Sequence, residues 1–255
     1  MTIYDSETAW FLTERTTFIR SYYDTAAAPF LERLRRIEAG EPPFDNPPIA
    51  EDGEPPYLTE WCNTQTALDV VGQSCVGLLS DTVKLFFAHW SSRVVPFSLD
   101  ASERKLTKEQ GFLAGYRKAL GEIYDTDWSD CPVRFDIIEQ VVLARNRTQH
   151  GGSLMTLRVT HDRHTLDRHP KPHFASADEF ERGAGDVEAD GGSWGGLGAP
   201  AVTVSREALF TAIEEVERLA QWLDQEISRA WDWMAAGKEI RKERAKNMVA
   251  DPERF

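Results

Sequence analysis

The fold class is indicated most clearly by residues 205–234, which read SREALFTAIEEVERLAQWLDQEISRAWDWM. Apolar side chains recur there at alternating steps of four and three, at Leu209, Ile213, Val216, Ala220, Leu223, Ile227, Ala230 and Met234. This spacing places them on one face of a helix about 40 Å long, the seam typical of a helical bundle. Because Ser205 suits the N-cap position, we expect the helix to begin just after it.

The chain before this seam shows the same helical rhythm over four more stretches. We expect helices at 6–38, 57–92, 107–124 and 133–150. Pro29 lies inside the first of them and should kink or split it, because proline lacks a backbone donor and clashes with the preceding turn.

Local signals refine two of these helices. The stretch at 57–92 carries one stripe, mostly apolar, formed by Leu68, Val71, Cys75, Leu78, Thr82, Leu85 and His89. A histidine on such a stripe is usually a core or interface residue, so we assign His89 no chemistry. Thr107 followed by Gln110 matches a capping box, which predicts that the third helix begins at Thr107.

Three segments do not fit a helix. Residues 41–56 are rich in proline and acid and should form a loop, and 237–255 is a charged C-terminal extension. Residues 153–204 read as an insertion, in which 155–160 alternates apolar and polar side chains like a strand that pairs with 201–204. The expected fold is therefore all-α. It is a single domain (1–255) with four to five long helices and a small β-hairpin or loop insertion.

Composition narrows the function classes. The chain has 255 residues, a formal net charge of −13 and 41% hydrophobic residues, which is enough for a packed core. We find no apolar run of about 20 residues and no secretory signal, so we expect no membrane partner. Three cysteines without C-x-x-C spacing fit a reducing cytoplasm. Such an acidic chain is not a general nucleic-acid coat, although basic groups can still gather locally.

The segment VVLARNRTQHGG at residues 141–152 is the most informative stretch for chemistry. It closes an amphipathic helix with a set of polar residues, of which Arg145, Asn146, Gln149 and His150 fall within one arc of about 140° at 100° per residue. Their side chains can therefore converge on one ligand. The double glycine that follows should end the helix and leave the His150 imidazole at an open edge.

This set of residues suits cleavage of RNA. A ribose 2′-hydroxyl attacks the neighbouring phosphate once a base removes its proton, and a histidine can take that proton or donate one to the leaving oxygen. A guanidinium stabilises the negative charge that develops on the phosphorane. An asparagine can orient the phosphate or the imidazole. No metal and no cofactor is needed for these steps.

Arg145-Asn146-x-x-x-His150, at the end of a helix in a helical chain, resembles the R-x4-6-H signature of HEPN domains. The resemblance covers the motif and the helical pattern, over about residues 57–236. It implies a helical bundle that forms a homodimer and acts as a metal-independent endoribonuclease in toxin–antitoxin or antiviral defence systems. It also implies an antitoxin or other regulatory partner, with Arg145 and His150 catalytic and Asn146 supporting. Some family members carry a tyrosine two residues after the histidine, where this chain has Gly152.

The region around the motif carries a local excess of positive charge. We predict an RNA-binding surface formed by Arg147, Gln149, Arg158, Arg163, Arg168 and Lys171. The alternative is a solvated hairpin, because charge runs usually face water. A second R-x4-H match, Arg168 to His173, spans two prolines and cannot lie on a helix.

Two further alternatives remain open from the sequence. His161, His164, His169 and His173 could hold zinc, although no cysteine lies near them and His-rich tracts are often merely polar. In addition, Arg145 and His150 could simply stabilise a helix C-terminus. The chain would then be a non-catalytic HEPN-like module that binds RNA, a nucleotide or a protein partner, since fold does not establish activity.

Overall fold

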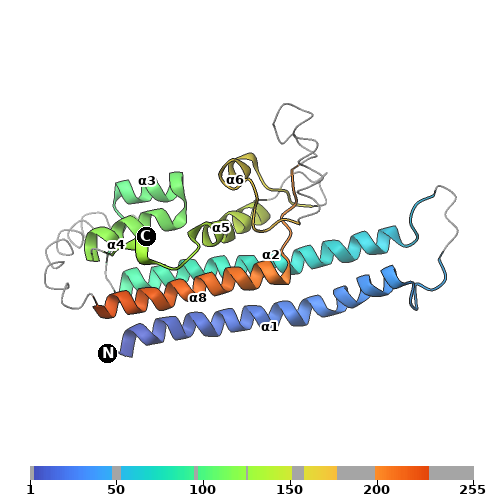
Figure 1. Ribbon diagram of the computed structural model, residues 1–255, viewed down its shortest axis with the longest axis horizontal. Coiled ribbons are helices and arrows are strands. Elements are labelled where there is room, and N and C mark those ends of the chain that lie inside the picture. The colour runs from blue at the N-terminus through green and yellow to red at the C-terminus, as the bar shows by residue number, and fades with distance from the viewer. Residues whose placement is uncertain are drawn as a thin grey trace. The chain divides into compact units, whose positions relative to one another are not determined.

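The computed structural model describes residues 3–47, 53–94, 97–124, 126–150, 158–176 and 199–229. Figure 1 shows the α-helices of these residues, which are α1 (Ile3–Ala39), α2 (Leu58–His89), α3 (Ala101–Gln110), α4 (Phe112–Tyr124), α5 (Phe135–Gln149), α6 (Arg163–Arg168) and α8 (Arg206–Arg229). A π-helical turn, η1 (Trp90–Val94), follows α2, and a 3-10 turn, η2 (Trp128–Asp130), follows α4. The prediction of an all-α fold is confirmed.

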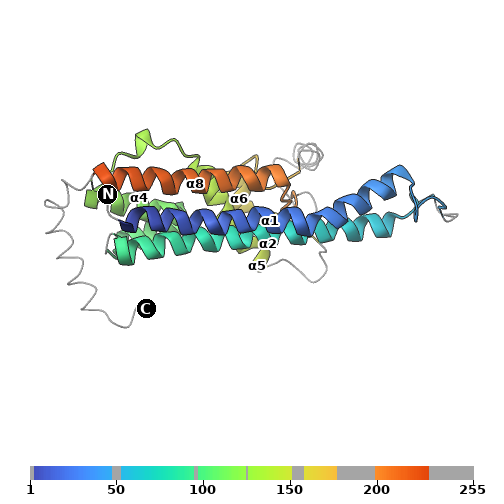
Figure 2. The same cartoon turned by 90° about the horizontal axis from the view of Figure 1, so that it is seen from below.

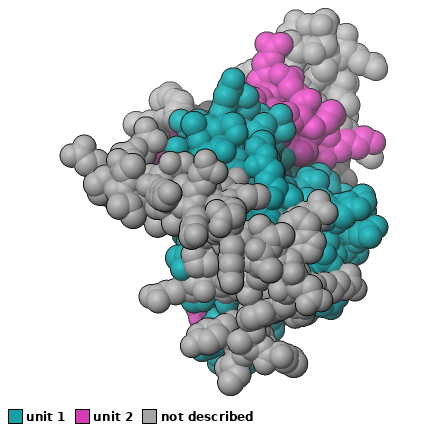
Figure 3. Space-filling view, turned by 90° about the vertical axis from the view of Figure 1, so that its left-hand side faces the viewer, with its two compact units in different colours: residues 1–17, 79–142, 211–255 teal, residues 18–78, 143–210 magenta. Residues whose placement is uncertain are grey.

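The chain divides into two compact units, coloured in Figure 3. Unit 1 contains residues 1–17, 79–142 and 211–255, and unit 2 contains residues 18–78 and 143–210. The helices α1, α2, α5 and α8 each contribute residues to both units.

α1 continues through Pro29 as one helix, so of the expected kink or split the split is wrong, and Figure 2 shows the C-terminal part of the helix bent away from the preceding part. A proline inside a helix removes one backbone hydrogen bond. The helix tolerates this loss because its buried face continues on both sides of Pro29, with Ala27 1% and Leu34 9% exposed. The described parts of the 41–56 segment contain no helix and form turns, as predicted.

α2 buries only part of the expected stripe. Val71, Cys75 and Thr82 are buried, whereas Leu78 and Leu85 are 40% and 50% exposed. A neighbouring stripe is buried as well, at Val76, Leu79, Val83 and Phe87, and continues to Trp90 in η1. Both stripes have helical spacing, and the one that carries the large aromatic side chains removes more apolar area from water. Leu58–Ser92 is long and apolar enough to cross a membrane by length and composition, and 56% of its apolar window is buried within the molecule.

The helix expected at 107–124 is two helices. α3 begins earlier because Asp100 forms the capping box: its Oδ1 accepts from the Glu103 amide at 2.8 Å, and Glu103 Oε2 accepts from the Asp100 amide at 2.6 Å. Gly111, at φ 109°, separates α3 from α4. This positive φ favours glycine, and a Cβ atom at residue 111 would lie 2.6 Å from Oε1 of Glu139.

α8 follows its prediction closely. The Ser205 hydroxyl accepts from the Ala208 amide at 3.1 Å, which confirms the N-cap. The seam is at most 2% exposed at Leu209, Ile213, Val216, Ala220 and Leu223. The seam side chains from Ile227 onward and the extension at 237–255 lie outside the described residues.

The expected β-hairpin is not formed by the described residues of unit 2. Thr160 and Ala201 form a single antiparallel bridge, supported by a 2.7 Å hydrogen bond from the Val202 amide to the Val159 carbonyl. The pairing stops there because the chain turns directly into α6, capped by Asp162. Of the strand predicted at 155–160, residues 155–157 lie outside the described residues, as do 177–198 of the insertion.

Candidate functional site

α5 positions the polar motif at the end of a buried helix. Its apolar side chains are at most 8% exposed at Ile137, Ile138, Val141, Val142 and Ala144. The motif residues that follow all belong to unit 2 and turn toward solvent: Arg145 is partly exposed, and Asn146, Gln149 and His150 are exposed. α5 ends at Gln149, within one residue of the expected end, while Gly151 and Gly152 lie outside the described residues.

Two of the three predicted catalytic side chains are in contact. Arg145 Nη1 donates to Asn146 Oδ1 over 3.4 Å, a long hydrogen bond that leaves room for a ligand to compete. His150 follows one helical turn after Asn146, and its amide donates to the Asn146 carbonyl at 3.1 Å. In the part of the chain that the structure describes, the His150 imidazole makes no hydrogen bond or ion pair. The imidazole can therefore meet a ligand without first breaking an internal bond.

Two arginines predicted to bind RNA are engaged inside unit 2. Arg158 Nε lies 3.0 Å from Oδ2 of Asp69, and its Nη2 donates to the Thr203 hydroxyl at 3.1 Å. Asp69 is 6% exposed and the Arg158 side chain is 35% exposed, so a partly exposed guanidinium pairs with a buried carboxylate. Arg147 Nε donates to the Thr160 carbonyl at 2.5 Å. Both guanidinium groups therefore connect the bridged segment to the helices α2 and α5 of this unit.

The remaining predicted RNA contacts lie at the surface. Arg163 and Asp167, on one face of α6, are 3.8 Å apart with side chains that are 77% and 68% exposed. Lys171 and Gln149 are exposed, and Arg168 is partly exposed. An ion pair this open contributes little stability, so a phosphate can replace the carboxylate at Arg163 at small cost.

The four histidines of the insertion do not form a cluster. His161 is 4% exposed and its Nε2 lies 2.9 Å from the Phe174 carbonyl oxygen, whereas His173 Nε2 lies 2.9 Å from the Ala208 carbonyl oxygen. Burial lowers the pKa of His161, against the smaller opposing effect of the Phe174 contact. Across the described ranges, no three His, Cys, Asp or Glu side chains are arranged to hold a metal ion.

Sequence reasoning missed Asp69, the partner of Arg158. The available signal was a carboxylate on the apolar helix at 57–92, inside the stretch LDVV, where burial of an unpaired charge would be costly. No family model, curated protein or solved structure matches this chain.

Proposed function

We propose that this protein is a metal-independent endoribonuclease of the HEPN type that acts in the cytoplasm as part of a toxin–antitoxin or antiviral defence system. The observation that carries the proposal is the pair at the end of α5: an exposed imidazole at His150 and a guanidinium at Arg145, on consecutive turns of a helix end. The all-α fold is of the kind the motif requires. RNA is the substrate, and an antitoxin or regulatory protein is the expected partner.

In the proposed reaction, His150 removes the proton from a ribose 2′-hydroxyl, and the oxygen attacks the adjacent phosphorus. The bond from phosphorus to the 5′-oxygen then breaks, and that oxygen receives a proton. The products are a 2′,3′-cyclic phosphate and a free 5′-hydroxyl. In a homodimer, the second copy of His150 supplies the proton to the leaving oxygen.

Arg145 is assigned to the negative charge that develops on the phosphorane, which a guanidinium can contact through two parallel donors. Asn146 acts as a positioning residue, because its Oδ1 accepts from Arg145 Nη1 and so limits the rotation of the guanidinium. The exposed groups at Gln149, Arg163 and Lys171 are suited to follow the RNA backbone.

The decisive test is cleavage of a mixed RNA pool by the full chain with EDTA present. We expect wild type to cut, and His150→Ala and Arg145→Ala each to lose about 100-fold or more in rate. His164→Ala is the matched control, because His164 is an exposed histidine of the same unit outside the motif. Cleavage that survives both motif substitutions would overturn the assignment. RNA binding without cleavage would favour the non-catalytic scaffold instead.

A further inference from the structure

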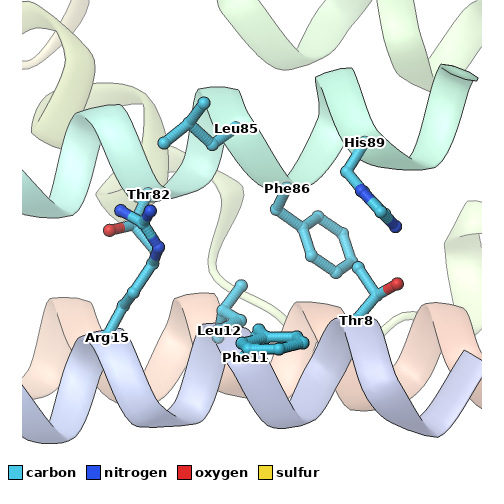
Figure 4. A pocket seen from close by; sticks show the side chains of 8 residues that line it. All are labelled: Thr8, Phe11, Leu12, Arg15, Thr82, Leu85, Phe86 and His89. Atoms are coloured by element: carbon cyan, nitrogen blue, oxygen red, sulfur yellow. The ribbon is translucent and has the colours of Figure 1, made fainter.

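Unit 1 contains a pocket that the proposed nuclease site does not use. It lies between α1 and α2, has a volume of about 340 Å³, and is open to solvent (Figure 4). The side chains that define it are Phe11, Leu12 and Arg15 from α1 and Leu85, Phe86 and His89 from α2. This volume is within the range of pockets that hold small organic molecules.

The walls of the pocket are apolar and remain partly exposed. Leu12 and Phe86 form its buried surface, at 4% and 5% exposure, whereas Phe11 and Leu85 are 54% and 50% exposed at its rim. Exposed large apolar side chains that face a shared hollow are typical of a binding site, because a ligand would remove them from water. The exposure of Leu85, which belongs to the stripe we expected to be buried, creates one side of the hollow.

The polar groups of the lining favour an anion. Arg15 is exposed and forms no ion pair with any residue in the described part of the chain. Figure 4 shows Arg15 and Thr82 toward one end of the pocket and Thr8 and His89 toward the other. No acidic side chain is among the described residues that line it. Although the chain as a whole is acidic, this pocket combines an apolar surface with one guanidinium group.

We propose that this pocket binds a single-chain anionic amphiphile, of the class of a medium-chain carboxylate. The carboxylate pairs with Arg15, which can donate two parallel hydrogen bonds to it. The hydrocarbon chain covers Phe11, Leu12, Leu85 and Phe86. A polyphosphate ligand fits less well, because the lining offers one guanidinium and is otherwise largely apolar. The pocket shares no residue with the proposed nuclease site, so either assignment can fail alone.

The test uses the full chain and dansyl-labelled undecanoate, whose fluorescence rises on transfer to an apolar site. Unlabelled dodecanoate, dodecanol and dodecyltrimethylammonium then compete for the probe. We expect one saturable site per chain, with dodecanoate binding about fivefold or more tightly than the other two. Arg15→Gln should remove this preference while leaving dodecanol unchanged. Leu85→Asp should abolish probe binding, because it places a carboxylate on the wall.

Two matched controls separate the pocket from general surface effects. Lys108→Gln removes an exposed cation of unit 1, and Leu31→Asp changes a leucine that is 51% exposed, close to the 50% of Leu85. Neither should alter binding. Non-saturable binding, or equal affinity for the three head groups, would overturn the proposal. The proposal would also be overturned if wild type formed a dimer, Leu85→Asp dissociated that dimer, and wild type did not bind the probe. That result would place a second copy of the chain in the groove.

Discussion

The basic segment at 145–173 contains two groups of residues that look alike in sequence and differ in the structure. Arg145, Asn146 and His150 present their side chains at the exposed end of α5. In the second, internal group, Arg147 donates to the Thr160 carbonyl and Arg158 pairs with the buried carboxylate of Asp69. Each group contains arginine. What separates them is the exposure of the motif side chains and the buried carboxylate that pairs with Arg158, which lies far away in sequence.

The largest effect is expected for His150→Ala, and two measurements on this variant test the difference between the exposed and the internal groups. His150→Ala should lower the cleavage rate about 100-fold or more while changing the free energy of unfolding by less than about 0.5 kcal/mol, because the imidazole has no internal partner in the described part of the chain. Urea unfolding and single-turnover cleavage check the two parts. A large loss of stability would mean that His150 belongs with the internal group.

Arg158→Ala should show the opposite pattern. It leaves the buried Asp69 carboxylate without its guanidinium, so we expect a loss of about 1–3 kcal/mol in the free energy of unfolding. Arg163→Ala is the control, and removing its open pair with Asp167 should cost about 0.5 kcal/mol or less. Equal losses in the free energy of unfolding for the two substitutions, measured by urea unfolding, would contradict the internal role of Arg158.

His161 should make the stability of the protein depend on pH. Its pKa is lowered by burial in the folded protein, so below about pH 6.5 the unfolded chain binds a proton that the folded chain does not. The free energy of unfolding contributed by this group is complete above about pH 7 and falls as pH decreases toward 5. Thermal unfolding of wild type and His161→Gln between these pH values is the measurement. The variant should show the smaller decrease, and identical slopes would contradict the assignment.

The smallest effect concerns the surface cations. Arg163→Glu and Lys171→Glu should each weaken RNA binding by about fivefold or less, because each acts on phosphates through an exposed charge. The slope of log affinity against log salt should also become shallower, by about 0.7 for each phosphate of a single strand that the variant no longer neutralises. Lys108→Gln, in the other unit, serves as the control in the same binding titration.

Sequence predicted the elements that have one dominant pattern. The α8 seam, its Ser205 cap and the exposed arc at the end of α5 each follow from a single periodicity. α2 carries two apolar stripes, so periodicity alone could not choose between them. The start of α3 was misplaced because Asp100 with Glu103 and Thr107 with Gln110 both match a capping box, and the upstream pair forms it.

The internal role of Arg158 could not be predicted. Its partner Asp69 lies 89 residues earlier, and no local pattern links the two. The pocket between α1 and α2 was missed for a related reason. It needs two helices to leave Phe11 and Leu85 exposed together, and the sequence stripe assigned Leu85 to the core.

The bridge between Thr160 and Ala201 also has a consequence for protein engineering. Hydrogen bonds from the His161 amide to the Pro200 carbonyl, at 3.0 Å, and from the Thr203 amide to the Phe174 carbonyl, at 3.0 Å, join the two chain segments that flank residues 177–198. A nick within 177–198 should therefore leave two fragments that stay associated.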